Sequence, residues 1–318
     1  MKSLVLTVFS LLVSLLMGEA MLRVAGHAPT DFAARSANGW SVPDAKFGWT
    51  NRPGIVASRE AGNVPMTFWP NGQRASRSDI AANTATRIDM VGDSITQGYG
   101  VADTETFVWR LGEILPQAAF ENLGVGGYGT YQSLLRMQAR AATPPAVFVY
   151  GYFGDHRERN VASWSWVRSL TDAQGRHIVP PHALVENGRL APQPGAIVEP
   201  WPLEGVSAIV SELHRAWLRL ILRGRRDAVQ PVMEELFAEM AKTANDAKAG
   251  FVVLLLADAP DWVLRSLDQQ KIATADCRTP EFERDPSLRI GGVGHPTAAR
   301  HAAWAECLAP AIEAALKR

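Results

Sequence analysis

The sequence is poor in three features that would narrow its function at once: cysteine, net charge and long apolar runs. It has two cysteines among 318 residues, and its cysteines and histidines do not fall at the spacing of a metal site. Its 32 basic and 32 acidic residues balance, so no positive field indicates nucleic-acid binding. Repeats and low-complexity tracts are also missing. We therefore predict no metal, no cofactor and no nucleic-acid partner.

The single long apolar run lies at the N-terminus. After Lys2, residues 4–17 carry no charge, which is shorter than the ~20 residues that span a bilayer comfortably. A helix that continues past Glu19, with Arg23 reaching the interface, would be long enough. Because Glu19 and Arg23 occupy the place of a cleavage site, we expect an uncleaved signal anchor, with a cleaved, secreted form as the alternative.

The position of Lys2 before the apolar run also predicts an orientation. Positive residues favour the cytoplasmic side, so the main body would lie on the periplasmic face of the inner membrane. In such an exported protein Cys277 and Cys307 could pair, although nothing in the sequence requires a disulfide.

The rest of the chain divides by its patterning. We expect residues 1–25 to be the anchor, 26–86 a linker and small β-rich prelude, and 87–318 the main domain, with an insertion at about 156–230. Strands are expected at 87–91, 119–125, 146–153 and 251–256, and helices at 104–115, 130–142, 206–223, 231–249, 261–273 and 297–317. Residues 276–294 look irregular. The alternation predicts an α/β fold, a three-layer α/β/α sandwich around a parallel, flavodoxin-like sheet.

Chemistry-bearing residues follow the expected strands. Gly92-Asp93-Ser94 comes directly after the first strand, where open α/β sheets place their ligands. A free serine is a poor nucleophile and needs a base. His295, just before the last expected helix, is the candidate base. The glycine-rich loop at 124–129 follows the second strand, and Asp155 follows the third.

These motifs resemble the SGNH (GDSL) hydrolase superfamily, and its bacterial membrane-anchored esterases and acyltransferases in particular. The matching stretches are VGDSITQGYGV at 91–101, NLGVGGYGTYQ at 122–132 and GHP at 294–296. The resemblance implies that Ser94 is the nucleophile and His295 the general base. It also implies that backbone N–H groups of Ser94 and Gly127 form an oxyanion hole.

Two positions depart from the family pattern. The family has an asparagine as a third oxyanion donor where Asp155 stands, and an ionised carboxylate cannot donate. Either Asp155 is protonated, or His156 or Asn160 donates, or this contribution is missing. The family's orienting aspartate is also absent, because residues 292 and 293 are glycine and valine. His295 would then be oriented by a backbone carbonyl, by Asp285 or Asp258, or not at all.

Three functional hypotheses follow. The favoured one is a serine ester hydrolase acting on an O-acylated envelope glycan, with Trp164, Trp166 and Trp201 as possible sugar-stacking surfaces. An acyl transferase would use the same site. A non-catalytic relative that binds a glycan or partner is the third. Residues 124–129 also fit the dinucleotide fingerprint, but no acidic residue ends the next strand, which disfavours a nucleotide site.

Overall fold

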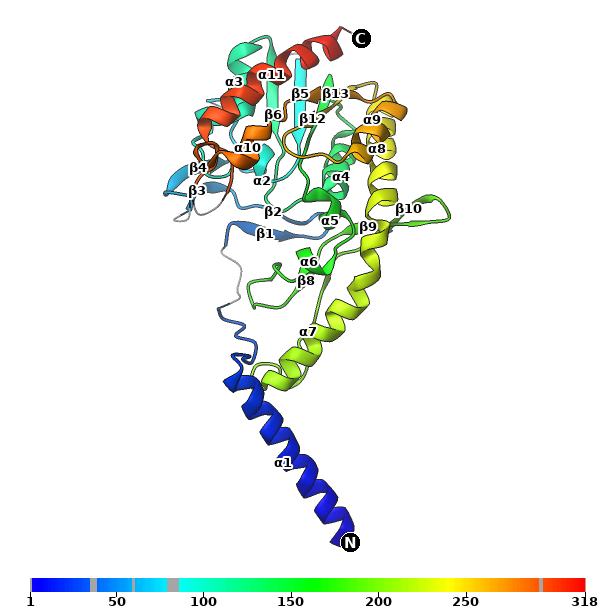
Figure 1. Cartoon of the computed structure of the whole chain (residues 1–318). Coiled ribbons are helices and arrows are strands. Elements are labelled where there is room, and N and C mark those ends of the chain that lie inside the picture. The colour runs from blue at the N-terminus through cyan, green and yellow to red at the C-terminus, as the bar shows by residue number, and fades with distance from the viewer. Residues whose placement is uncertain (1, 35–38, 59–60, 79–85, 292–293, 318) are drawn as a thin grey trace. The chain divides into compact units, whose positions relative to one another are not determined.

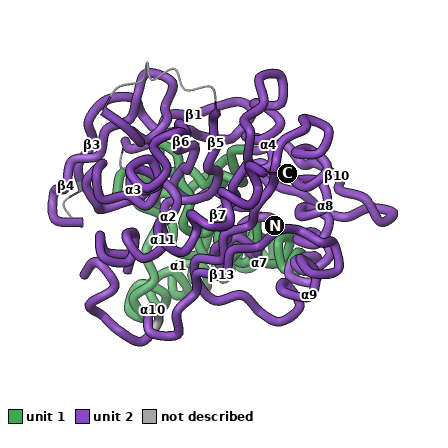
Figure 2. Tube along the Cα trace, turned by 90° about the horizontal axis from the view of Figure 1, so that it is seen from above, with its two compact units in different colours: residues 1–38, 162–179, 196–225 green, residues 39–161, 180–195, 226–318 purple. Residues whose placement is uncertain are grey.

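The chain folds into two compact units. A computed structural model describes residues 2–34, 39–58, 61–78, 86–291 and 294–317. Unit 1 is formed by Met1–Asn38, Ala162–Val179 and Ala196–Arg225, and unit 2 by Gly39–Val161, Pro180–Gly195 and Arg226–Arg318. Figure 2 distinguishes the two units by colour.

Unit 2 is built on a five-stranded sheet in which every neighbouring pair is parallel. Its strands are β5 (Thr86–Val91), β6 (Ala118–Asn122), β7 (Val147–Tyr152), β12 (Gly250–Leu255) and β13 (Ala273–Asp276). The strand order is β13-β12-β7-β5-β6. Numbered along the chain as strands of this sheet, that is the 2-1-3-4-5 order of flavodoxin-like folds. The predicted fold class is confirmed.

Helices cover both faces of this sheet, as Figure 1 shows. One face packs against α3 (Phe107–Ile114) and α11 (Ala298–Leu316), and the other against α4 (Thr130–Arg140), α8 (Val229–Asp246) and α9 (Asp261–Gln269). Side chains alternate accordingly along the strands. On β12, Val252 and Leu254 enter the first core, whereas Val253 and Leu255 enter the second. Burial on both faces explains why the strands are apolar throughout.

The strand β13 was not predicted. Ala-Thr-Ala-Asp has few of the bulky apolar residues that mark a buried strand, and it lies at the edge of the sheet. The other sheet strands and the long helices were predicted within a few residues of their bounds. Smaller elements complete unit 2: the hairpins β1–β2 (Ser41–Asp44, Gly48–Asn51), β3–β4 (Gly54–Ser58, Val64–Phe68) and β9–β10 (His182–Glu186, Arg189–Gln193), and the short helices α2 (Ser94–Gln97), α5 (His156–Asn160) and α10 (Pro280–Arg284).

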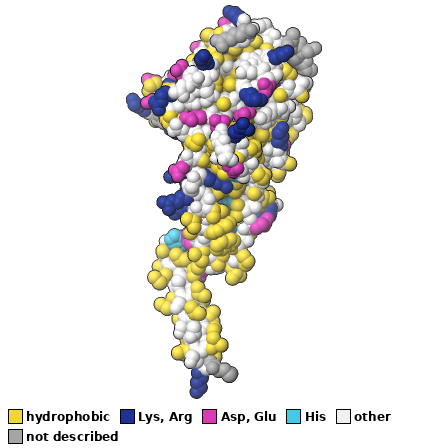
Figure 3. Space-filling view, turned by 90° about the vertical axis from the view of Figure 1, so that its right-hand side faces the viewer, with side chains coloured by type: hydrophobic (Ala, Val, Ile, Leu, Met, Phe, Trp, Pro, Cys, Tyr) yellow, Lys and Arg dark blue, Asp and Glu magenta, His cyan; other side chains and the backbone are white. Residues whose placement is uncertain are grey.

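Unit 1 contains the N-terminal helix α1 (Lys2–Val24), α6 (Trp164–Val167), the strands β8 (Ile178–Val179) and β11 (Ala196–Ile197), and the long helix α7 (Ala208–Arg223). Among the described helices, α1 is the one long and apolar enough to cross a membrane, a test that signal sequences also pass. None of its residues is buried, and apolar side chains dominate the face of α1 seen in Figure 3.

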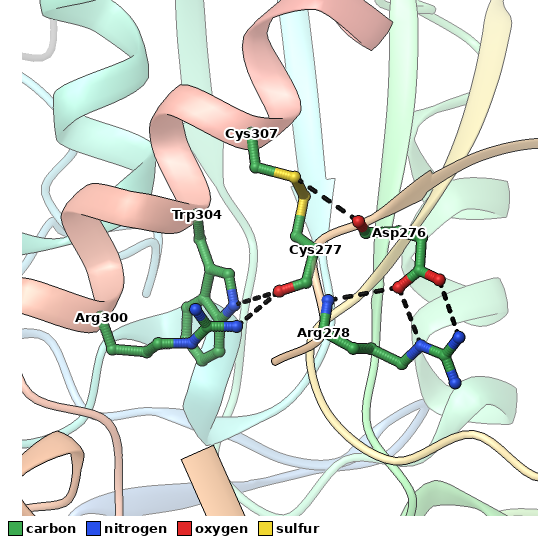
Figure 4. Close-up of a disulfide and its surroundings, with 6 residues drawn as sticks. All are labelled: Asp276, Cys277, Arg278, Arg300, Trp304 and Cys307. Carbon is green, nitrogen blue, oxygen red and sulfur yellow. Dashed lines mark hydrogen bonds and ion pairs between the residues drawn. A yellow bond between two sulfur atoms is a disulfide. The ribbon is translucent and has the colours of Figure 1, made fainter. Parts of the chain in front are cut away.

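A disulfide joins Cys277, directly after β13, to Cys307 on α11, with the two Cα atoms 5.9 Å apart. Figure 4 shows Trp304 and Arg300 of the same helix donating hydrogen bonds to the Cys277 carbonyl. The pairing that the sequence left open is therefore present, and it ties the edge strand to the helix that follows the His295 loop.

Candidate active site

The strand order places the loops that carry the motifs at one edge of the sheet. β5 lies between β6 and β7 in the sheet. The chain therefore continues from β5 to its neighbour on one side, β6, and then crosses to its neighbour on the other side, β7. Such a switch point is where open α/β sheets bind ligands, at the carboxyl ends of the strands. The loops after β5 and β7 carry Ser94 and Asp155, and the glycine loop follows β6.

The central geometric observation is the contact between Ser94 and His295. The His295 Nε2 atom lies 2.9 Å from the Ser94 Oγ atom, across 201 residues of sequence. Ser94 is the first residue of α2 and is partly exposed. A hydroxyl within hydrogen-bond distance of an imidazole can lose its proton as it attacks an electrophile.

Strand β2 holds the glycine loop in place. The Asn51 Nδ2 atom donates to the Gly124 carbonyl at 3.0 Å, and the Trp49 indole N–H donates to the Gly126 carbonyl at 2.9 Å. The Tyr128 hydroxyl donates back to the Trp49 carbonyl. The expected linker and prelude therefore include a strand that is part of the site, which sequence patterning alone did not reveal.

Two backbone donors remain available beside the serine. Asp93 caps α2 by accepting the Ile95 N–H at 2.9 Å. Within the described part of the chain, no hydrogen bond engages the N–H of Ser94 or of Gly127. Gly127 has φ of 82°, a left-handed conformation that glycine adopts without strain, and a Cβ built on Gly126 would lie 3.9 Å from the Ser94 Cβ.

Gly124→Ala should disrupt this loop, whereas Gly126→Ala should not. A Cβ on Gly124 would collide with the Gln97 backbone nitrogen and lie 2.9 Å from the Thr96 carbonyl carbon, so backbone must move. On Gly126 the nearest atoms lie at 3.7 and 3.9 Å, ordinary contact distances. We expect Gly124→Ala to lower the unfolding free energy by ~1–3 kcal/mol in urea titrations. Equal stability of the two variants would contradict this account.

A buried ion pair lies behind the nucleophile. The Asp93 Oδ2 atom accepts a hydrogen bond from the Arg159 guanidinium at 2.8 Å, and Arg159 also donates to the Tyr128 carbonyl at 2.9 Å. Burial alone would raise the pKa of Asp93, but His156, Arg159 and the Ile95 N–H favour its charged form and hold the pKa well below its ordinary range. Arg159 thus ties the serine turn to the glycine loop.

His156 links the same carboxylate to a chain of buried polar groups. Its Nε2 atom lies 3.2 Å from the Asp93 Oδ2 atom, and its Nδ1 atom lies 2.6 Å from the Tyr150 hydroxyl. Burial lowers the pKa of His156, an effect that Asp93 opposes. A neutral imidazole with its proton on Nε2 fits both contacts, because Tyr150 can then donate to Nδ1. Thr130 lies 2.6 Å from the Tyr150 hydroxyl, and Asn160 donates to Thr130 at 3.0 Å.

These contacts can be compared with the three side chains considered as a third oxyanion donor, Asp155, His156 and Asn160. Asp155 has a side chain that is 70% exposed and pairs with Arg159 at 3.3 Å. His156 directs its ring nitrogens to Asp93 and Tyr150. The Asn160 amide donates to Thr130 and accepts the Tyr131 N–H. The last two side chains are therefore committed to the scaffold, and neither is directed at Ser94.

The His295 loop is held by its own backbone and by the Tyr99 ring. Residues 292 and 293, where the family has its aspartate, lie outside the described residues. The Asp285 carboxylate accepts the Ser287 N–H at 2.8 Å and so caps the turn at its own position. The His295 carbonyl accepts the Ile290 N–H at 2.7 Å, and the Tyr99 ring packs against the imidazole with centroids 4.7 Å apart. Backbone and ring contacts thus hold this loop.

The tryptophans expected to stack on sugars are in unit 1. Trp164 packs edge-on against His177 at 5.8 Å, and Trp201 stacks on His214 at 4.8 Å. In unit 2 the Tyr99 ring contacts the His295 ring, and the Trp40 ring lies 5.3 Å from the Tyr99 ring. Sequence reasoning missed Tyr99 and Trp40, although Tyr99 lies inside the first motif.

Comparison with known proteins finds similarity among solved structures. No protein-family model matches the chain, and no curated protein matches it. Among solved structures it is similar to TesA (16% identity, 72% of this chain and 99% of that one, TM-score 0.41). It is also similar to a lipolytic G-D-S-L family protein from Veillonella parvula (15%, 70% and 96%, 0.40) and to Axe2, an acetylxylan esterase from Geobacillus stearothermophilus (12%, 74% and 96%, 0.36). At these TM-scores the likeness carries no weight for function, which must be argued from the geometry.

Proposed function

We propose that this protein is a serine ester hydrolase. The observation that carries the proposal is the 2.9 Å contact between the Ser94 Oγ and His295 Nε2 atoms at the switch point of the sheet. A nucleophile, a base and two neighbouring backbone N–H donors are the parts that acyl transfer through an acyl-enzyme requires.

The proposed reaction has two steps. The Ser94 oxygen attacks the ester carbonyl carbon while His295 takes the hydroxyl proton, and the N–H groups of Ser94 and Gly127 stabilise the oxyanion. The tetrahedral intermediate collapses, and His295 returns the proton to the departing alcohol. Water, activated by the same imidazole, then attacks the acyl-enzyme and releases the acid and free Ser94. A sugar hydroxyl in place of water would give acyl transfer.

Covalent labelling tests this mechanism directly. A fluorophosphonate should modify the detergent-solubilised full chain once, at Ser94, because the activated oxygen attacks phosphorus and expels fluoride. Ser94→Ala should remove the label, whereas Ser133→Ala, which alters a buried serine that bonds to the Gly129 carbonyl, should retain it if it folds. Peptide mass spectrometry locates the adduct. Absence of labelling on the folded wild type would support the non-catalytic alternative.

We further propose that α1 is retained as a membrane anchor, with unit 2 on the periplasmic side and an O-acylated envelope glycan as substrate. Glu19 supports retention. Its carboxylate accepts hydrogen bonds from Ser207 and from the N–H groups of Ala208 and Ile209, at 2.9–3.1 Å, and so caps α7. Arg23 adds a bond to the Val206 carbonyl at 2.8 Å. Cleavage after these residues would leave the Ala208 and Ile209 N–H groups at the start of α7 without this acceptor.

The anchor proposal predicts an intact N-terminus. The purified protein should have the mass of the full chain and should fractionate with membranes. Glu19→Ala should lower the midpoint of thermal unfolding, because the Ala208 and Ile209 N–H groups lose their side-chain acceptor. Ser10→Ala, an exposed change elsewhere on α1, is the control. A mature chain that begins beyond residue 24 would refute retention.

A further inference from the structure

A row of three aromatic rings leads away from the Ser94–His295 pair. The Tyr99 ring lies 4.7 Å from the His295 ring, and the Trp40 ring lies 5.3 Å from the Tyr99 ring, tilted by 40°. All three residues belong to unit 2. The row therefore begins at the proposed general base and ends at a tryptophan.

Local backbone contacts hold Tyr99 and Trp40 in place. The Tyr99 N–H donates to the Ser94 carbonyl at 3.0 Å, so the tyrosine moves with the nucleophile. Its neighbours Gly98 and Gly100 both have positive φ, which turns the chain sharply at this point. The Trp40 carbonyl accepts the Arg52 N–H at 3.0 Å, anchoring the tryptophan beside the β1–β2 hairpin. The rings are thus held by the elements that build the site.

The Trp40 side chain keeps part of its surface exposed. Both Trp40 and Tyr99 are only half-buried. Among the described residues, Tyr99 is the one ring that contacts Trp40. By contrast, Trp201 lies between His214 and Trp217 within unit 1. A large indole joined to the Ser94–His295 pair through Tyr99, with part of its surface open, is suited to bind the apolar face of a ligand.

We propose that Trp40, with Tyr99, forms the subsite for the sugar ring that carries the ester. This rests on the proposed esterase function and specifies its substrate class. The C–H groups of a pyranose give it an apolar face that stacks on indole, while its hydroxyl groups stay in water. When the acyl group of the ester is transferred to Ser94, the alcohol is released beside His295. The alcohol part of the substrate, here the sugar, therefore lies where the aromatic row begins.

The test compares a sugar ester with a small ester on the full-length protein in detergent. For acetylated xylo-oligosaccharide, Trp40→Ala should raise KM ~10-fold, the loss of about 1.4 kcal/mol of binding, with kcat within about two-fold. For 4-nitrophenyl acetate both constants should stay within about two-fold. Trp40→Tyr should restore most of the sugar KM. Trp217→Ala, which removes an exposed tryptophan of unit 1, should change nothing.

A binding measurement separates this proposal from the proposed function. The Ser94→Ala variant, titrated with the same acetylated oligosaccharide in a calorimeter, should show saturable binding that Trp40→Tyr weakens little and Trp40→Ala weakens ~10-fold. No saturable binding would overturn the subsite even if 4-nitrophenyl acetate is hydrolysed. Equal losses on both esters in Trp40→Ala would overturn it too, because they would show that Trp40 only positions Tyr99 and His295. If the wild type hydrolyses neither ester, the proposed function itself fails.

Discussion

His295→Ala is expected to lower kcat for 4-nitrophenyl acetate hydrolysis by ~10³- to 10⁵-fold with little change in KM. The imidazole 2.9 Å from the Ser94 hydroxyl is the proposed base, and no other described side chain is hydrogen-bonded to that oxygen. Without the base, the serine must attack as a neutral hydroxyl. Release of nitrophenolate, followed by absorbance, measures the effect.

The serine and histidine should act as one unit. Ser94→Ala should cost as much as His295→Ala, and the double variant should lose little more, because neither group functions without the other. His27→Ala removes a partly exposed histidine of unit 1 and should leave the rate unchanged. Losses that multiply in the double variant would show that the two side chains act independently.

Asp93→Ala is expected to destabilise the fold by ~3–5 kcal/mol, since it would remove the buried carboxylate that pairs with the Arg159 guanidinium. Asp155→Ala is the matched control. Asp155 pairs with the same guanidinium at 3.3 Å, but its side chain is 70% exposed, so its loss should cost under ~1 kcal/mol. Urea unfolding followed by circular dichroism compares the two. Similar losses would show that Asp93 is not a buried, charged partner of Arg159.

The Asp93 carboxylate should make the free energy of unfolding depend on pH in the acid range. Because the pKa of Asp93 is lowered in the folded protein, its ionised form favours folding above the ordinary pKa of about 4. That contribution is lost as pH falls toward the lower folded value. Asp93→Asn should therefore lose less stability than the wild type between pH 5 and pH 3. Parallel acid profiles would contradict this linkage.

The fold could be predicted because its signals are local. Apolar strands and amphipathic helices alternate, and that pattern alone leads to a parallel sheet with helices on both faces. The strand β13 was not predicted because Ala273–Asp276 is short and lies at the edge of the sheet. Its pairing with β12 and its packing under α11 define it as a strand. Such tertiary contacts leave no periodicity in the sequence.

The site could be predicted only where a motif marked it. Ser94 and His295 were named from short sequence patterns, and the structure places them within hydrogen-bond distance. Asn51, Arg159 and Trp40 could not be found in this way, because each acts through a partner far along the chain or at a turn. From the sequence alone a buried arginine cannot be told from a surface arginine, because only folding brings the carboxylate that pairs with it close.

The bond between Cys277 and Cys307 makes the maturation of this protein depend on where the chain folds. Thiols stay reduced in a cytosol and are oxidised outside it. A chain folded in a reducing cytosol would lack the link between β13 and α11, the helix that follows the His295 loop. The redox state of the compartment would thus decide whether this link forms, and recombinant protein should be produced where disulfides form.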